Sequence, residues 1–65
     1  MKYKKGDTHY VFIGPGKPYK IHILAVVDKY QIVFRWYGRR NQWWNYEIWH
    51  REMLDIRIME SKVNS

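Results

Sequence analysis

Two neighbouring segments of alternating apolar residues restrict the fold of this chain more than any other feature. Residues 19–27 and 30–37 are rich in Val, Ile, Tyr, Phe and Trp, and a polar dipeptide at 28–29 separates them. β-Branched and aromatic residues favour strands, and a short polar break between two such runs is typical of a hairpin. The pattern therefore predicts two antiparallel strands joined by a tight turn.

A two-residue turn gives this predicted hairpin one apolar face and one mixed face. An antiparallel sheet that is covered on one side only requires this contrast. On the apolar face the pairs are Val27 with Tyr30, Ala25 with Ile32, Ile23 with Phe34, and Ile21 with Trp36. On the mixed, outer face the pairs are Val26 with Gln31, Leu24 with Val33, His22 with Arg35, and Lys20 with Tyr37.

Glycine, proline and polar residues at 14–18 and 38–41 mark two further turns. The runs on either side of these turns also have the composition of strands. They predict an all-β chain that folds as one domain over residues 1–65. The five predicted strands are Thr8–Ile13, Tyr19–Val27, Tyr30–Tyr37, Gln42–Ile48 and Leu54–Met59.

The register of the fourth predicted strand depends on the loop that precedes it. We expect this loop to span Gly38–Gln42. Because side chains alternate along a strand, a slip by one residue would exchange Trp43 with Trp44, and the sequence leaves that choice open. In the expected register the core residues are Trp44, Tyr46 and Ile48, and the outward residues are Trp43, Asn45 and Glu47.

The C-terminal segment has two competing interpretations. Alternation of Leu54, Ile56 and Ile58 with polar or exposed positions predicts a last strand, which we favour. Dense helix-forming residues and apolar residues at helical spacing support the alternative, an antiparallel meander that ends in a helix from about residue 47. The helical spacing involves Trp49, Met53, Ile56 and Val63.

The layout of the predicted strands resembles the SH3-like small β-barrels of the KOW and Tudor type. A Lys-Gly-Asp sequence at residues 5–7 precedes the first strand, and Val-Phe-Arg-Trp at residues 33–36 forms the third. The resemblance implies a five-stranded barrel that binds RNA, DNA, methylated side chains, peptides or other proteins. The chain departs from methyl-reading Tudor domains because it lacks clear acidic cage residues near its aromatic residues.

The chain is also similar in kind to short orphan proteins of bacteriophages. That resemblance rests on size and style, and it implies an inhibitor or anti-defence protein that binds a host protein or a signalling nucleotide. We keep this as the alternative function.

Composition favours an anionic partner. The chain has 12 Lys and Arg residues against 6 Asp and Glu residues, which gives a formal net charge of +6. A basic protein suits a polyanion such as nucleic acid. Arginine and tryptophan concentrate between residues 35 and 51, so the predicted outer face combines cations for phosphates with rings on which bases stack.

We therefore expect a binding module that holds nucleic acid or another polyanion with low sequence specificity. The predicted binding residues are Lys20, His22, Arg35, Tyr37, Trp43 and Asn45, with Arg39 and Arg40 at the adjoining loop. The simpler alternative is that aromatic pairs and cation–π contacts only stabilise the sheet.

An apolar centre interrupts the predicted outer face. Its residues are Leu24, Val26 and Val33. Exposed apolar clusters mark protein contacts, so we expect either a second copy of the chain or a host protein at this position.

Other classes of function have little support in the sequence. There is no cysteine, and His9, His22 and His50 are too dispersed for a metal site. No nucleophile stands beside a base, so we expect neither catalysis nor a cofactor. No apolar run reaches the ~20 residues of a membrane span, and we expect a cytoplasmic protein.

Overall fold

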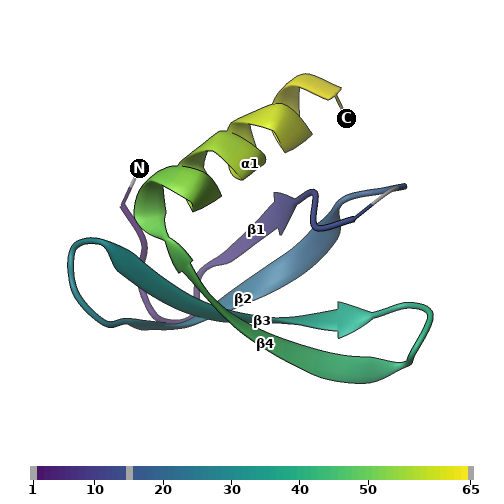
Figure 1. The fold of residues 1–65 in the computed structure, drawn as a ribbon, viewed down its shortest axis with the longest axis horizontal. Helices are drawn as coiled ribbons and strands as arrows, with labels where there is room; N and C mark the ends of the chain where they lie inside the picture. Colours follow the sequence, from purple (N-terminus) through teal and green to yellow (C-terminus); the bar gives the residue numbers. More distant parts are fainter. Residues whose placement is uncertain (1, 15, 65) are drawn as a thin grey trace.

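The computed structural model describes residues 2–14 and 16–64, without the side chains of residues 63 and 64. It shows a four-stranded antiparallel sheet in the order β1-β2-β3-β4, followed by a C-terminal helix (Figure 1). The helix packs against β1 and β4 on one side of the sheet. The elements are β1 Thr8–Val11, β2 Tyr19–Val26, β3 Gln31–Gly38, β4 Trp43–His50 and α1 Arg51–Asn64.

The sheet is open, so the expected closed barrel of five strands is wrong and the meander with a C-terminal helix fits. The predicted fifth strand lies within α1. Leu54 and Ile58 are almost fully buried, whereas Ile56 between them is 54% exposed. Burial therefore recurs every fourth residue, which is the period of a helix rather than of a strand.

The helix begins directly after β4 at Arg51. The Nδ1 atom of His50 accepts a hydrogen bond from the backbone N–H of Glu52 at 3.2 Å. A side-chain acceptor at this position satisfies one of the unpaired N–H groups of the first helical turn. The N-terminal segment is tied to the same helix, because the Tyr3 hydroxyl donates a hydrogen bond to Asp55.

The core lies between α1 and the sheet. Burial of these apolar side chains is the main favourable term for a chain without disulfides. The predicted apolar face is confirmed where Ile21, Ile23, Ile32 and Phe34 enter this core. The full buried set is Tyr3, Val11, Ile21, Ile23, Ile32, Phe34, Leu54 and Ile58, with Ile13, Trp36 and Trp49 packed against it.

The β2–β3 hairpin confirms the predicted register in its first half only. Ile21 pairs with Trp36 and Ile23 with Phe34, but a bulge between Ile23 and Ala25 shifts the rest by one residue. Ala25 then pairs with Val33 and Val26 with Ile32. Val26 consequently moves to the helix-facing side, and the predicted trio of Leu24, Val26 and Val33 is divided between the two faces.

The turn of this hairpin explains the shift. The backbone N–H of Val27 donates to the carbonyl of Gln31 at 3.0 Å, so three residues form the turn instead of two. Asp28 Oδ1 accepts hydrogen bonds from the N–H groups of Tyr30 at 2.6 Å and Gln31 at 3.0 Å. Aspartate commonly folds a turn in this way, and the bulge in β2 absorbs the extra residue.

Strands β3 and β4 pair in a register that is shifted by one residue from the expected one, so the expected register is wrong. Gly38 is a strand residue that pairs with Trp43. Its missing side chain is required, because a Cβ atom there would collide with the amide of Asn41. Gln42, in the left-handed conformation with φ 53°, donates its N–H to the Gly38 carbonyl at 2.9 Å. The loop is thus shorter than expected.

Glu47 supports this register from the helix-facing side. Its carboxylate accepts a hydrogen bond from the indole N–H of Trp36 at 2.6 Å and another from Trp49 at 3.2 Å. In the expected register Glu47 would lie on the opposite side from Trp36. A buried indole N–H needs an acceptor, so the observed register satisfies both tryptophans.

Replacing Glu47 with glutamine tests this arrangement. Glu47→Gln removes the charge and turns an N–H₂ group toward one indole N–H, and we expect a loss of about 1–3 kcal/mol in the free energy of unfolding. Urea denaturation followed by tryptophan fluorescence measures it. Glu52→Gln, on the exposed first turn of α1, is the control and should change stability by less than about 0.5 kcal/mol. Equal stability of the two variants would contradict the proposed role.

Candidate functional site

The candidate site is the face of the sheet that points away from α1, here called the outer face. Strand pairing places its side chains opposite to the buried residues of the core. Both α1 and Tyr3 lie on the other side, so within residues 2–14 and 16–64 no element packs over this face. Its members include Thr8, Tyr10, Lys20, His22, Val33, Arg35, Tyr37, Trp44, Tyr46 and Ile48, with Ala25, Gln31 and His50 toward the β2–β3 turn.

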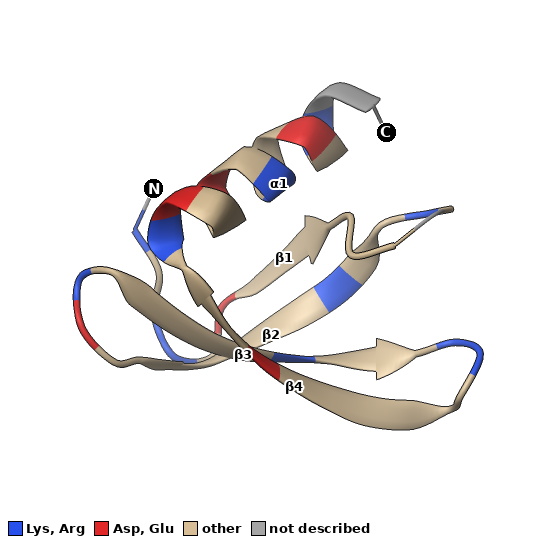
Figure 2. Cartoon of the chain, viewed as in Figure 1, with Lys and Arg blue, Asp and Glu red and all other residues tan. Residues whose placement is uncertain are grey.

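Charge is segregated between the two faces. None of the six acidic residues lies on the outer face, whereas Lys20 and Arg35 do. Figure 2 shows the acidic residues on α1, in turns and at one place in β4. The acidic residues are Asp7 and Asp28 outside the regular elements, Glu47 on the helix-facing side of β4, and Glu52, Asp55 and Glu60 in α1.

Trp44 is the centre of the outer face. The guanidinium carbon of Arg35 lies 4.2 Å from its ring centroid, which is a cation–π contact. The rings of Tyr37 and His22 meet Trp44 edge to face at 5.3 and 5.6 Å. These contacts join three strands and hold the Arg35 guanidinium in place, and an arginine fixed in this way is prepared for planar recognition of a phosphate.

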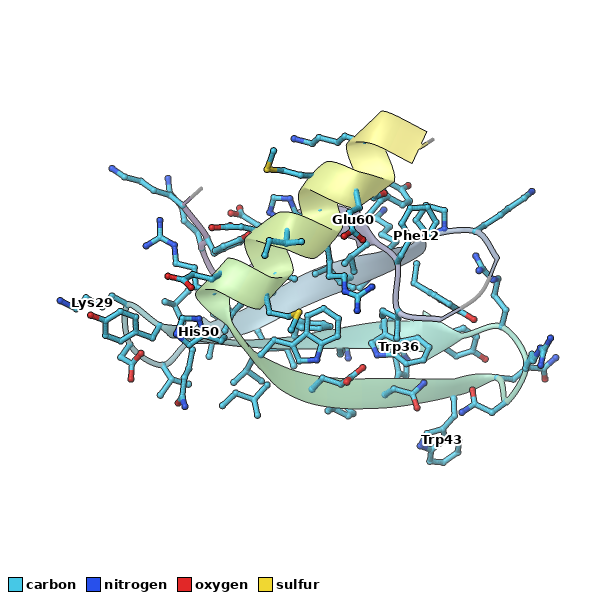
Figure 3. All side chains as sticks on the ribbon, turned by 45° about the horizontal axis from the view of Figure 1, so that its top comes forward. Phe12, Lys29, Trp36, Trp43, His50 and Glu60 are labelled. Atoms are coloured by element: carbon cyan, nitrogen blue, oxygen red, sulfur yellow. The ribbon has the colours of Figure 1, made fainter. Side chains whose placement is uncertain are left out.

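A hollow of about 360 Å³ opens at the end of the outer face beside the β3–β4 turn. Trp43 is 71% exposed and Tyr46 is 62% exposed. Figure 3 shows Trp43 projecting away from the ribbon at this end of the molecule. We call this feature the aromatic hollow, and it is lined by Tyr37, Gln42, Trp43, Trp44 and Tyr46.

The structure brings four of the predicted binding residues together. Lys20, His22, Arg35 and Tyr37 lie on the outer face as expected. Asn45 does not, since it lies on the helix-facing side and its Nδ2 donates to the Trp43 carbonyl at 3.0 Å.

Sequence reasoning missed Trp44 and Tyr46 as outer-face residues because the register was displaced by one. Trp43 is exposed as expected, but the expected place on the outer face is wrong, because alternation along β4 gives Trp43 the side of Asn45 and Glu47. Trp44 occupies the centre of the outer face instead. Gly38, read as part of the turn, was the signal that could have corrected the assignment.

The two arginines of the β3–β4 turn have different surroundings. Arg39 donates to the carbonyls of Lys17 at 2.9 Å and Pro18 at 3.4 Å, and its guanidinium carbon lies 4.0 Å from the Tyr19 ring centroid. It therefore fastens this turn to the β1–β2 loop and has a structural role. Arg40 is exposed at the same turn and is available to a ligand of the outer face.

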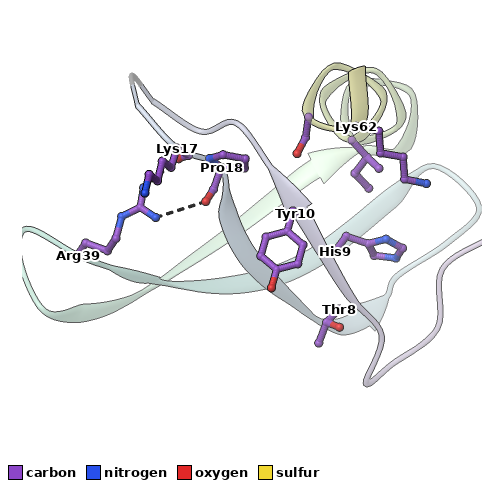
Figure 4. Close-up of a pocket in the computed structure, with 9 residues that line it drawn as sticks. Thr8, His9, Tyr10, Lys17, Pro18, Arg39 and Lys62 are labelled. Atoms are coloured by element: carbon purple, nitrogen blue, oxygen red, sulfur yellow. Dashed lines mark hydrogen bonds between the residues drawn. The ribbon is translucent and has the colours of Figure 1, made fainter. Parts of the chain in front are cut away.

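A second hollow, of about 490 Å³, lies at the edge of β1 (Figure 4). Its walls come from β1, the β1–β2 loop and the C-terminal half of α1, and Arg39 closes one end. The lining contains no acidic residue. The residues are Thr8, His9, Tyr10, Lys17, Pro18, Arg39, Ile58, Ser61 and Lys62.

His9 in this second hollow couples stability to pH. Burial lowers the pKa of His9 below its ordinary value; the negative charge of Asp7 opposes this shift and the positive charge of Lys62 adds to it. The unfolded chain therefore binds this proton more readily than the folded chain. Stability that is present above the ordinary histidine pKa of about 6.5 is lost as the pH falls below it.

We expect His9→Phe to flatten this pH dependence. Urea unfolding of the natural chain should become easier between about pH 7.5 and about pH 5, an interval that spans the ordinary histidine pKa. In His9→Phe the loss over the same interval should be smaller, because the substituted ring cannot be protonated. An identical loss in both proteins would rule out His9 as its source.

Metal binding and membrane crossing can also be considered for the part of the chain that the structure describes. Among the described residues, no group of three or more His, Asp or Glu side chains is placed to hold a metal ion. No helix within residues 2–14 and 16–64 is long and apolar enough to cross a membrane.

Comparisons with protein-family models, with curated proteins and with solved structures found no match for the chain. The candidate site is therefore interpreted from its own geometry.

Proposed function

We propose that the protein binds single-stranded nucleic acid through the outer face, with little sequence specificity over most of that face. One observation carries the proposal. Exposed aromatic rings and basic side chains share a sheet face on which none of the six acidic residues lies. This combination matches the general chemistry of single-strand binding, in which cations follow the backbone and rings stack on bases.

Each outer-face group has a distinct part in the proposed complex. Lys20, Arg35 and Arg40 neutralise phosphates, and Arg35 does so from a fixed position over Trp44. Tyr37 and Tyr46 present exposed rings to unpaired bases. Stacking of a base on such a ring contributes about 1–3 kcal/mol.

A duplex fits the molecule less well than a single strand. The major groove accepts a helix or a two-stranded ribbon, but α1 lies against the sheet and carries Glu52, Asp55 and Glu60. An open sheet face with projecting rings instead suits bases that are free to leave the stack.

Salt dependence tests the phosphate contacts. We expect the affinity for a labelled single-stranded oligonucleotide, measured by fluorescence anisotropy, to fall by roughly 0.7 log units per log unit of salt for each neutralised phosphate. Arg35→Gln should reduce that slope by about 0.7, because one phosphate contact is lost. Tyr46→Ala should weaken binding without changing the slope.

Lys29→Gln is the matched control for this experiment. Lys29 is exposed in the β2–β3 turn, where its amino group lies 5.3 Å from the Tyr30 ring centroid. Its removal should leave the slope unchanged. A flat salt response of the natural chain, or equal slopes for Arg35→Gln and Lys29→Gln, would overturn the proposal.

A protein partner is the second candidate. Val33 pairs directly with Ile48 across β3 and β4, and Ile48 is 55% exposed on the outer face. This apolar end favours a protein contact, as an inhibitor or anti-defence protein of phage type would need for a host protein. A second copy of the chain would have to bring Lys20 and Arg35 of both copies onto facing surfaces, which disfavours a dimer that uses the whole face.

Native mass spectrometry separates the two candidates. A dimer that dissociates in Ile48→Lys, together with no affinity for oligonucleotides, would favour a protein contact. A monomer that binds oligonucleotides in both the natural chain and Ile48→Lys would favour nucleic acid.

A further inference from the structure

We infer that the aromatic hollow holds a single nucleobase, adenine in preference to other bases, and that Gln42 recognises its edge. The inference rests on the proposed function and deepens it, since it gives an otherwise unspecific face one selective position. Neither the charge of the chain nor the outer face as a whole requires such a position. It follows from the residues around this one hollow.

The walls of the aromatic hollow suit a flat ligand. Tyr37, Trp43, Trp44 and Tyr46 supply four rings around about 360 Å³. The backbone of Trp43 is held at this end, because its N–H donates to Asn41 Oδ1 at 3.2 Å and it pairs with Gly38 at the start of β4. A large ring that lies mostly in water is an unfilled stacking surface.

Aromatic hollows also bind organic cations, and the local charge decides against that ligand. Cation–π sites accept quaternary ammonium groups, but no acidic residue lies on the outer face to help neutralise one. The guanidinium of Arg35 already occupies the Trp44 ring at 4.2 Å. Arg40 adds a further positive charge in the adjoining turn. These cations repel an ammonium ligand and attract the phosphate attached to a base.

Gln42 supplies the polar group that distinguishes one base from another. It lines the hollow, and its side chain makes no hydrogen bond to any residue that the structure describes. Its carboxamide offers one acceptor beside donors, the pattern that pairs with the adjacent amino group and ring nitrogen of adenine. The Hoogsteen edge of guanine presents two acceptors. Cytosine also carries an amino group beside a ring nitrogen, so adenine is preferred to it through the larger area that a purine offers for stacking.

Homopolymer binding by variants of Gln42 tests the inference. Anisotropy is measured for oligoadenylate, oligouridylate and oligocytidylate of equal length at one salt concentration. The natural chain should prefer oligoadenylate by roughly tenfold, the lower part of the range for a bidentate contact. Gln42→Met keeps the length of the side chain and removes its hydrogen bonds, so the preference should shrink to the smaller difference that stacking alone gives, while the affinity for oligouridylate is retained.

Gln31→Met is the matched control. Gln31 is an exposed glutamine at the opposite end of β3 and is not among the residues of the hollow. Its substitution should preserve the preference for oligoadenylate. Circular dichroism checks that both variants fold. Trp43→Ala should weaken the binding of oligoadenylate more than the binding of oligouridylate.

Adenosine monophosphate identifies the source of the base and separates the two proposals. If it quenches tryptophan fluorescence and Gln42→Met removes the quenching, the hollow binds the base of a free nucleotide, even if no oligonucleotide binds and the proposed function fails. If oligoadenylate is preferred and adenosine monophosphate does not bind, the hollow holds a base that is part of a strand. Equal affinity for all homopolymers, or a preference that Gln42→Met leaves undiminished, overturns the inference alone. If neither any oligonucleotide nor adenosine monophosphate binds, both the inference and the proposed function are overturned.

Discussion

The hydrogen bonds of Glu47 to two indole N–H groups are the interaction on which the rest of the structure depends. They place Trp36, Glu47 and Trp49 on the helix-facing side of the sheet. Because side chains alternate along β4, the same choice turns Trp44 and Tyr46 to the outer face. One carboxylate thus satisfies two part-buried donors and decides which rings are available to a ligand.

The two faces of the sheet divide the demands of folding and binding between them. The helix-facing side buries the apolar core and takes the internal acid Glu47, while α1 carries three further acids. The outer face is left with basic and aromatic side chains, of which Arg35 and Trp44 are joined by a cation–π contact. Such a contact stabilises the sheet and at the same time positions a cation, so the structural and binding interpretations of these residues are compatible.

Sequence patterns predicted the parts of the fold that depend on local alternation. The core positions of Ile23 and Phe34 followed from alternation in a hairpin, and the outward positions of Lys20 and Arg35 followed with them. The prediction of a C-terminal strand was wrong. Residues 54–58 are too few for their pattern to distinguish the period of a strand from that of a helix. The burial of Leu54 against the sheet decided for the helix.

Composition and periodicity by themselves determined a basic, β-rich chain with an apolar hairpin and a surplus of aromatic residues. Only the tertiary structure decided the register of β4 and the exposure of Trp44, since both depend on contacts between residues distant in sequence. Glu47 accepts from Trp36 across the two strands, and that contact has no local signature. Alternation along a strand determines which residues share a face. Contacts with the neighbouring strand determine whether that face points toward the helix or away from it.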